Sequence, residues 1–313
     1  MFERVGCVFP GQGSQYIGMG KSLAAQFKIA NDSFEESNSY LGFDLKKIIF
    51  EGPEEKLKLT AIQQPAILTT SIAIWRVLQQ ERQFNPIFVA GHSLGEYSAL
   101  IASEALTFGD GVKLSHLRGT AMQEAVPVGR GLMAAILGLE ADCVGDICKQ
   151  ASAEDEIVVP ANLNSSLQIV ISGDSNAVQR ALDLAKKVGA KRAIPLSVSA
   201  PFHSPLMKPA AERMKKAFNE IDFHSLKTPY ISNVDANLHA DSDGIKDRLI
   251  EQITAPVLWD SSMRTILGLN CHEILEIGPG NVLTNLFRRL EGAPEVKSLD
   301  TLESLLSFVN GKV

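Results

Sequence analysis

The chain has 313 residues, of which 45% are hydrophobic, and this length can bury a large core as a folded globular protein. Its formal net charge of −6 argues against nucleic acid or an anionic membrane surface as the main partner, and no apolar stretch approaches the span of a bilayer. The first residues lack the basic start and apolar segment of a secretory signal, so we expect a cytoplasmic protein.

The first predicted strand, residues 5–9, breaks at Pro10 into a glycine-rich turn, GQGSQYIGMG. Glycines at positions 11, 13, 18 and 20 match neither the dinucleotide-binding pattern G-x-G-x-x-G nor a P-loop, so nucleotide binding is not predicted. Such a turn lets the backbone approach a reacting group closely, and the N–H of Gln12 is our candidate donor to an oxyanion. An ordinary loop is the alternative.

Residues 34–58 are mixed and charged, with Gly52-Pro53 as a break, which predicts short helices and loops on the surface. Gln64-Pro65 is then expected to open a long, largely buried helix, because apolar residues recur from Ile67 to Leu78. This helix leads into the next strand by way of Asn85-Pro86, and a helix followed by a strand indicates an α/β layering.

The segment FVAGHSLGEY, residues 88–97, places Ser93 between Gly91 and Gly95 at the end of an apolar run. We interpret residues 87–90 as a strand, Leu94 onward as a helix, and the serine as the nucleophile of a sharp turn between them, for which the glycines leave space. The N–H of Leu94, at the helix N-terminus, is the natural first oxyanion donor. A tight turn that merely contains a serine is the alternative.

A further helix, predicted over residues 110–125, carries Arg118 on the same side as its apolar residues Leu114, Leu117, Ala121 and Met122. A guanidinium on an apolar face is costly unless it meets an anion, so we predict a clamp for a carboxylate. Snorkelling of the side chain to water and an internal salt bridge are the alternatives.

The break at Val126-Pro127 begins a segment with its own periodicity. Strands are predicted over residues 132–139, 157–163, 168–173 and 192–198, and helices over residues 141–151 and 176–188. This β-α-β-β-α-β order is ferredoxin-like. We therefore predict that residues 128–198 form a subdomain inserted into a larger α/β domain made of residues 1–127 and 199–313.

The larger domain resumes with SAPFHSPLM, in which Pro201 and Pro205 bracket His203 in a stiff loop before a helix over residues 207–218. Five other histidines compete as a base, but His203 lies at the domain boundary, where it can face a cleft. Strands over residues 229–234 and 272–277 and a final helix through Phe287 follow. Gln252 is polar within a mostly apolar stretch, where a helix cap or a core amide is the alternative role.

Six segments, taken together and in order, resemble the malonyl-CoA:acyl carrier protein transacylase family. They are FPGQGSQ at 9–15, GHSLGEYSAL at 91–100, RG at 118–119, NLNSSLQIVISG at 162–173, SAPFHSPLM at 199–207 and EIGPG at 276–280. The resemblance spans nearly the whole chain and is far more specific than any single motif. It implies an α/β-hydrolase-like large domain with a ferredoxin-like insertion, which coincides with the architecture predicted from periodicity.

The resemblance also implies a reaction. Ser93 would take the malonyl group from coenzyme A as an ester and pass it to the phosphopantetheine thiol of acyl carrier protein, with His203 as the base and then the acid. Arg118 would pair with the free malonyl carboxylate. In this family a backbone carbonyl rather than an aspartate orients the histidine, so the lack of an obvious third triad member is no objection.

Further site residues follow from the same resemblance. The backbone N–H groups of Gln12 and Leu94 would form the oxyanion hole, Gln252 would line the site, and Asn162 on the insertion would help to close it. The chain departs from the pattern at Arg130-Gly131-Leu132, which are bulkier than expected at the entrance to the insertion. Phe202 precedes the base, and a Phe there goes with malonyl over methylmalonyl in related polyketide acyltransferase domains.

The implied partners are malonyl-CoA and an acidic acyl carrier protein, in fatty-acid biosynthesis. A polyketide pathway is one alternative, and a serine esterase or thioesterase, which would release the acyl group to water, is another. Four cysteines are scattered without a C-x-x-C pair or nearby histidines at zinc-like spacing, so we predict reduced thiols, no metal and no bound cofactor. The candidate basic residues for docking the carrier protein are Lys187, Lys191, Arg192, Arg288 and Arg289.

Overall fold

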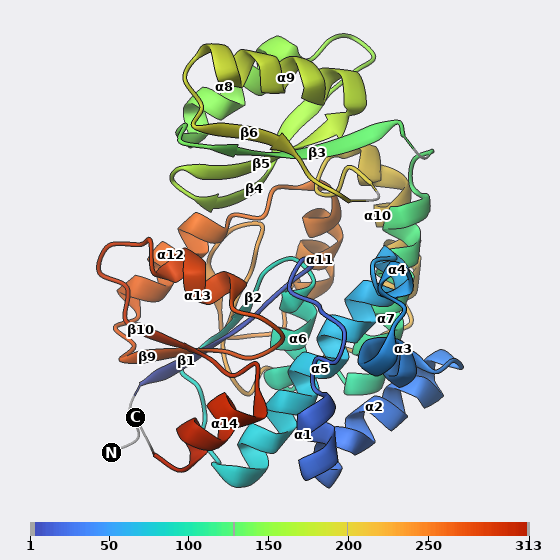
Figure 1. Ribbon diagram of the computed structural model, residues 1–313, viewed down its shortest axis with the longest axis vertical. Coiled ribbons are helices and arrows are strands. Elements are labelled where there is room, and N and C mark those ends of the chain that lie inside the picture. The colour runs from blue at the N-terminus through green and yellow to red at the C-terminus, as the bar shows by residue number, and fades with distance from the viewer. Residues whose placement is uncertain (1–3, 128, 199, 312–313) are drawn as a thin grey trace.

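Two β-sheets divide the chain into a larger and a smaller unit (Figure 1). The computed structural model describes residues 4–127, 129–198 and 200–311. The larger unit carries a six-stranded sheet of order β10-β9-β1-β2-β7-β8, and the smaller unit a four-stranded sheet of order β4-β5-β3-β6. The architecture is mixed α/β, as the alternation of helices and strands in the sequence predicts.

The six-stranded sheet is parallel except for its last pair, β7 with β8. Its strands are β1 (Val5–Phe9), β2 (Val89–Gly91), β7 (Tyr230–Ile231), β8 (Leu238–His239), β9 (Glu273–Glu276) and β10 (Glu295–Ser298). Alternate residues of β1 enter different cores, since Cys7 and Phe9 belong to one apolar cluster and Val8 to another. Both faces of this sheet are therefore covered, which explains why its central strands are continuous apolar runs.

Helices supply both covers (Figure 1). The face that contains Val8 is covered by α12 (Trp259–Gly268) and α13 (Val282–Phe287). The remaining helices of this unit are α1 (Lys21–Gln26), α2 (Lys28–Leu41), α3 (Leu45–Glu51), α4 (Glu54–Leu57), α5 (Thr60–Glu81), α6 (Gly95–Ala102), α7 (Phe108–Glu124), α10 (Lys208–Phe218), α11 (Ile245–Thr254) and α14 (Leu302–Val309), with a 3-10 turn η1 (Pro205–Met207).

The prediction that Gln64-Pro65 opens a helix is wrong in its boundary, because α5 begins at Thr60 and contains Pro65. Proline has no N–H to give to the carbonyl four residues earlier, which is that of Ala61. His116 Nδ1, on α7, lies 2.7 Å from that carbonyl oxygen and replaces the missing donor. A side chain distant in sequence therefore lets the helix continue through the proline.

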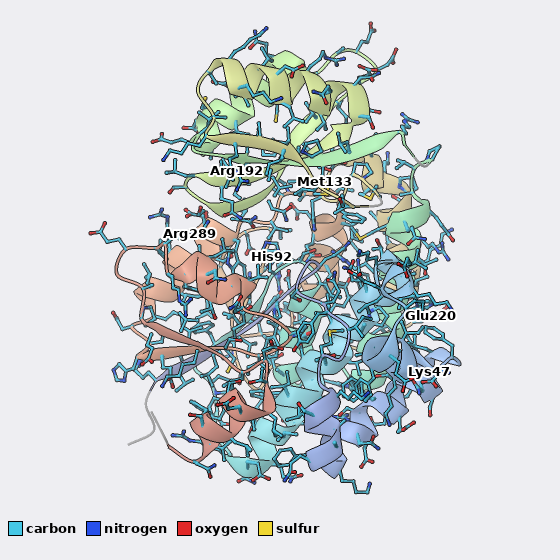
Figure 2. All side chains as sticks on the ribbon, viewed as in Figure 1. Lys47, His92, Met133, Arg192, Glu220 and Arg289 are labelled. Atoms are coloured by element: carbon cyan, nitrogen blue, oxygen red, sulfur yellow. The ribbon has the colours of Figure 1, made fainter. Side chains whose placement is uncertain are left out.

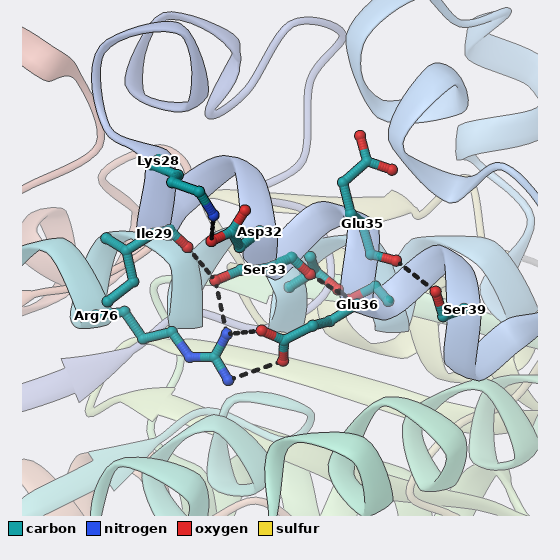
Figure 3. Close-up of polar contacts among 10 residues, drawn as sticks. Lys28, Ile29, Asp32, Ser33, Glu35, Glu36, Ser39 and Arg76 are labelled. Atoms are coloured by element: carbon teal, nitrogen blue, oxygen red, sulfur yellow. Dashed lines mark hydrogen bonds and ion pairs between the residues drawn. The ribbon is translucent and has the colours of Figure 1, made fainter.

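Residues 34–58 are also less superficial than predicted, because α2 is a 14-residue helix whose Phe34 is fully buried. Figure 3 shows how this helix is attached to α5. Arg76 Nη1 and Nη2 donate to the two carboxylate oxygens of Glu36 at 3.0 and 3.1 Å, and Nη1 also donates to Ser33 Oγ at 3.0 Å. The guanidinium lies 4.4 Å from the centroid of the Phe108 ring, so one residue joins α2, α5 and α7.

The smaller unit consists of β3 (Gly131–Leu137), α8 (Ala141–Ala151), β4 (Val158–Ser165), β5 (Gln168–Asp174), α9 (Ser175–Lys187) and β6 (Arg192–Pro195). Its strand pairs are all antiparallel. Helices α8 and α9 cover the face of this sheet that points away from the larger unit (Figure 1). The last strand ends at Pro195, three residues before its predicted end, and the predicted boundary residues 128 and 199 lie outside the described residues.

The two units are joined by hydrogen bonds between β4 and the segment after α11. Val257 N donates to Ala161 O, and Leu163 N donates to Val257 O, both at 2.9 Å. At the surface, Arg289 Nη1 donates to Gln168 Oε1 at 2.7 Å. The smaller sheet is therefore tied directly to the chain that leaves the C-terminal end of α11.

The C-terminal part differs most from prediction. The helix through Phe287 is not the last one, since β10 and α14 follow it. The strand β10 was not predicted because its sequence, EVKS, is mostly charged or polar. Such residues are usual in an edge strand, and here Lys297 forms an ion pair with Glu273 on β9. The strand predicted over residues 229–234 is only two residues long, and the chain turns at Ser232 to place Asn233 beneath the site described next.

Candidate functional site

Ser93 lies in a sharp turn between β2 and α6, with a φ of 51°. The flanking glycines are required by close packing. A Cβ on Gly91 would lie 1.9 Å from the carbonyl carbon of Gly95, and a Cβ on Gly95 would lie 2.1 Å from Phe9 O. The turn therefore forces the serine into a strained left-handed conformation, as the G-x-S-x-G spacing predicts.

The side chain of Asn233 stabilises this strained turn through two hydrogen bonds to its backbone. Its Oδ1 accepts from Ser93 N at 2.6 Å, and its Nδ2 donates to Gly91 O at 2.7 Å. The side-chain amide thus replaces backbone pairing on both sides of the serine. Sequence reasoning missed this residue, since its one signal is a polar side chain directly after the apolar strand β7.

His203 lies against Ser93. Its Nε2 is 2.7 Å from Ser93 Oγ, and its Nδ1 is 2.7 Å from the backbone oxygen of Gln252. Because a carbonyl oxygen only accepts, Nδ1 carries the proton and Nε2 is free to accept one from the serine. Burial, with a smaller contribution from the nearby Arg118 cation, lowers the pKa of His203 to about 3, so the imidazole is neutral at ordinary pH.

Arg118, on α7, reaches the same serine oxygen. Nη2 donates to Ser93 Oγ at 3.1 Å and to Gln252 Oε1 at 2.8 Å, and Nη1 donates to Gln64 Oε1 at 2.9 Å. The side chain does not snorkel, because the residue is only 1% exposed. An internal salt bridge is absent as well among the residues the structure describes, since all three of these acceptors are uncharged oxygens.

The Arg118 cation therefore has no anionic partner among the described residues. Its Nε is buried and has no acceptor within the described ranges, and the guanidinium carbon lies 5.7 Å from the centroid of the Tyr97 ring. Burial lowers the pKa of this arginine, because a charged group without an anionic partner is unfavourable away from water. A ligand carboxylate placed next to Ser93 would remove that cost.

Gln252, on α11, connects the three groups. Its backbone oxygen orients His203, its Oε1 accepts from Arg118, and its Nε2 donates to Ser93 O at 2.9 Å and to Glu96 Oε2 at 2.7 Å. Glu96, on α6, is fully buried, and burial raises its pKa to about 7. Sequence reasoning missed Glu96, although a charge within an apolar helix is the signal that identified Arg118.

The glycine-rich turn after β1 lies directly against the serine turn. His92 N donates to Phe9 O at 3.0 Å, and a Cβ on Gly11 would lie 2.3 Å from His92 O. This contact joins the segment just before Gln12 to the residue just before Ser93. The structure records no acceptor for the N–H of Gln12 or Leu94 among the described residues, and the oxyanion role of the pair stays a prediction.

Asn162 lies in β4 and is largely buried, where its backbone bridges to Val257. The asparagine of this strand whose side chain contacts the serine turn is Asn164, since its Oδ1 lies 2.8 Å from His92 Nε2. His92 also packs on the Trp259 ring, with centroids 5.4 Å apart. A closing role for Asn162 stays a prediction.

The described residues show neither a metal cluster nor a membrane-spanning helix. They contain no group of three or more His, Cys, Asp or Glu side chains placed to hold a metal ion, and the four cysteines are free. Within the same residues, no helix combines the length and apolarity needed to traverse a bilayer.

Comparison with known proteins gives one family. A model of the acyl transferase domain matches residues 7–301. The chain is 47% identical over 288 residues to malonyl CoA-acyl carrier protein transacylase of Bacillus subtilis, with 92% of this chain and 90% of that protein covered. It is 44% identical over 283 residues to the protein of the same name from Escherichia coli K12, with 90% and 91% covered.

Solved structures agree with this. The structure of malonyl CoA-acyl carrier protein transacylase from Coxiella burnetii has a TM-score of 0.95 and 43% identity, with 98% of this chain and 97% of that one covered. A second structure shows a type II polyketide synthase acyl-carrier protein in complex with its malonyl-transacylase. That chain has a TM-score of 0.95 and 41% identity, and the match covers 99% of this chain and 100% of that one.

Proposed function

The chain belongs to the acyl transferase domain family, and within it to the malonyl-CoA:acyl carrier protein transacylases, and from this premise we propose that it transfers malonyl groups by way of Ser93. The donor is malonyl-CoA, and the acceptor is the phosphopantetheine thiol of acyl carrier protein in fatty-acid synthesis. The observation that carries the proposal is that Ser93 Oγ lies within hydrogen-bonding distance of both a neutral histidine and a cation that has no anionic partner among the described residues.

In the first half-reaction, Ser93 Oγ attacks the thioester carbonyl of malonyl-CoA while His203 Nε2 takes the hydroxyl proton. The carbon–sulfur bond then breaks, and His203 returns the proton to the departing thiolate of coenzyme A. The malonyl group remains on the serine as an ester. In the second half-reaction, the carrier thiol gives its proton to His203 and attacks the ester carbonyl. The bond between this carbonyl carbon and Ser93 Oγ then breaks, and His203 returns the proton to Oγ.

Each of the other site residues supports one of these steps. Arg118 pairs with the free carboxylate of the malonyl group, and the N–H groups of Gln12 and Leu94 stabilise the oxyanion of each tetrahedral intermediate. Gln252 orients His203 through its backbone oxygen, 2.7 Å from Nδ1. Asn162 contributes to the wall of the site on the smaller unit.

The acyl-enzyme must persist until the carrier thiol arrives, which separates a transferase from an esterase. Ser93 is 8% exposed and His203 is 3% exposed, so an ester on Ser93 would be largely shielded from water by the surrounding residues. The complex of a related malonyl-transacylase with its acyl-carrier protein supports a carrier as acceptor.

The division of labour between the two units is part of the proposal. We assign residues 1–127 and 199–313 to an α/β-hydrolase-like catalytic domain and residues 128–198 to a ferredoxin-like insertion, in a cytoplasmic enzyme. An acidic carrier protein would dock on basic residues that flank the junction of the units. Figure 2 labels one candidate on each unit, Arg192 on β6 and Arg289 after α13, and both are exposed.

Intact-protein mass spectrometry tests the function. Mixing with malonyl-CoA should add one malonyl group to the wild type and none to Ser93→Ala, and addition of the carrier protein should remove it as malonyl-carrier product. An adduct that persists in Ser93→Ala, or no adduct on the wild type, would contradict the proposal. Release of free malonate without the carrier would identify a thioesterase instead.

A further inference from the structure

A buried carboxylate lies behind the nucleophile and takes no part in the steps described above. Glu96 is on the first turn of α6, and its Oε2 accepts from Gln252 Nε2 at 2.7 Å and from Asn233 N at 3.3 Å. Asn233 and Gln252 are the two residues whose side chains hold the backbone of Ser93. One carboxylate therefore contacts both supports of the serine turn.

The contact with Gln252 determines which way its side-chain amide faces. An amide can be rotated to exchange its oxygen and its NH₂ group. At one end Arg118 Nη2 is a donor at 2.8 Å, which requires the oxygen there. At the other end Ser93 O and Glu96 Oε2 accept at 2.9 and 2.7 Å, which requires the NH₂ group. The backbone oxygen of Ser93 can only accept, and so can the Glu96 carboxylate when it is ionised, so both disfavour the rotated orientation.

The amide orientation in turn determines where Arg118 points. The guanidinium is held between two amide oxygens, those of Gln64 and Gln252. Neutral amides orient the cation without neutralising it, so its charge remains available to a ligand. If the Gln252 amide were rotated, its NH₂ group would face the cation and displace it from the serine.

We propose that Glu96 is a positioning residue that locks the Gln252 amide, aligns Arg118 with the acyl carboxylate, and so sets the selectivity of the site for carboxylated acyl groups. This inference rests on the proposed malonyl transfer. It differs from a purely structural role in a measurable way. A residue that merely stabilised the serine turn would affect every acyl donor equally, whereas a residue that acts through Arg118 affects malonyl donors more than acetyl donors.

The test uses three variants at this position and the rates at which malonyl-CoA and acetyl-CoA label Ser93. Glu96→Met keeps the length of the side chain and removes both acceptor oxygens, and we expect the malonyl-to-acetyl ratio of rate constants to fall about tenfold. Glu96→Gln keeps one acceptor for Gln252 and Asn233, and its NH₂ group takes the place of Oε1, which has no partner in the described chain. It should restore the ratio to within about twofold of the wild type.

A second buried glutamate provides the matched control. Glu276 accepts from Leu283 N at 3.0 Å and Thr284 N at 2.7 Å, and none of the hydrogen bonds described for residues 4–127, 129–198 and 200–311 joins its side chain to Ser93, Arg118 or Gln252. Glu276→Met should lower the melting temperature and leave the ratio unchanged.

An unchanged ratio in folded Glu96→Met, or equal losses with both donors, overturns the proposal. Failure of Glu96→Gln to restore the ratio overturns it as well, because the effect would then come from charge and not from the acceptor. If Glu96→Met does not fold, Glu96→Asp is tested in its place, since it draws the carboxylate oxygens back from Gln252 by one methylene. An unchanged malonyl-to-acetyl ratio in Glu96→Asp would then overturn the proposal. A failure of malonyl transfer itself is distinguishable, because the wild type would then carry no malonyl adduct.

Discussion

His203 and Arg118 contact the same atom, Ser93 Oγ, at 2.7 and 3.1 Å. The neighbouring cation disfavours a second positive charge, and together with burial, the larger cause, it lowers the pKa of His203 to about 3. The same cation favours negative charge on the serine oxygen. In the proposed mechanism, this arrangement therefore favours both the neutral base and the nucleophile.

The low pKa of His203 predicts the acid limb of the pH profile. The active base is the neutral imidazole, so a lowered pKa keeps it active as the pH falls, and acylation should decline only well below the ordinary value of 6.5. In Arg118→Ala the loss of the cation raises the pKa of His203, and the acid limb with acetyl-CoA should move to higher pH. The pH dependence of kcat/KM for acylation measures both, and an acid limb that stays in place in the variant would contradict the coupling.

We also expect Arg118 to determine the choice of acyl group. Arg118→Ala should lower kcat/KM with malonyl-CoA by about 100-fold or more, with a much smaller loss for acetyl-CoA, because only the malonyl group has a carboxylate to leave unpaired. Arg118→Lys is the matched control and should lie between, since lysine keeps the charge but not the fork of donors. Equal losses on both substrates would refute the clamp.

Some of these residues are predictable from sequence and others are not. Ser93 is marked by its two glycines, His203 by its stiff loop, and Arg118 by its place on an apolar helix face. Asn233 contacts the serine turn across 140 positions of sequence, and nothing local to it indicates that contact. Glu96 could have been found by the argument applied to Arg118.

Among the elements, α2 and α5 show how a partly exposed ion pair can join helices. Arg76 is bidentate with Glu36 and stacks on Phe108. Because the pair is partly solvated, we expect Arg76→Ala to lower the free energy of unfolding by about 1 kcal/mol, measured by chemical denaturation. Lys28→Ala is the control, since the exposed Lys28–Asp32 pair should contribute nothing measurable. Equal effects of the two substitutions would contradict the prediction.

The elements that sequence reasoning placed wrongly have physical explanations. The start of α5 was obscured because Pro65 normally marks the first turn of a helix, whereas here His116 supplies a donor to Ala61 O from a distant part of the sequence. The edge strand β10 has a charged, partly exposed sequence, and β7 is shortened by the turn that delivers Asn233. The amphipathic helix α8 was predictable to the residue, since its periodicity is local.

At the scale of the whole molecule, the two units meet where the acyl carrier protein is expected to approach. We expect charge reversal at Lys191 and Arg192 on the smaller unit, or at Arg288 and Arg289 on the larger one, to slow malonyl transfer to the carrier at low salt. Acylation by malonyl-CoA alone serves as the internal control and should change less. Unchanged transfer kinetics with both patches reversed would exclude this surface.

The uncompensated Arg118 has a consequence for folding that extends beyond the reaction. A guanidinium that is 1% exposed, with an unsatisfied Nε–H, lowers the stability of the empty enzyme. An apolar side chain of similar length would remove this unfavourable buried charge and raise the free energy of unfolding, but it could not bind a carboxylate. Stability and the proposed activity therefore oppose each other at this position. If Ser93 is malonylated as proposed, the malonyl carboxylate supplies the missing counter-ion, and we expect the acyl-enzyme to be more stable to unfolding than the empty enzyme.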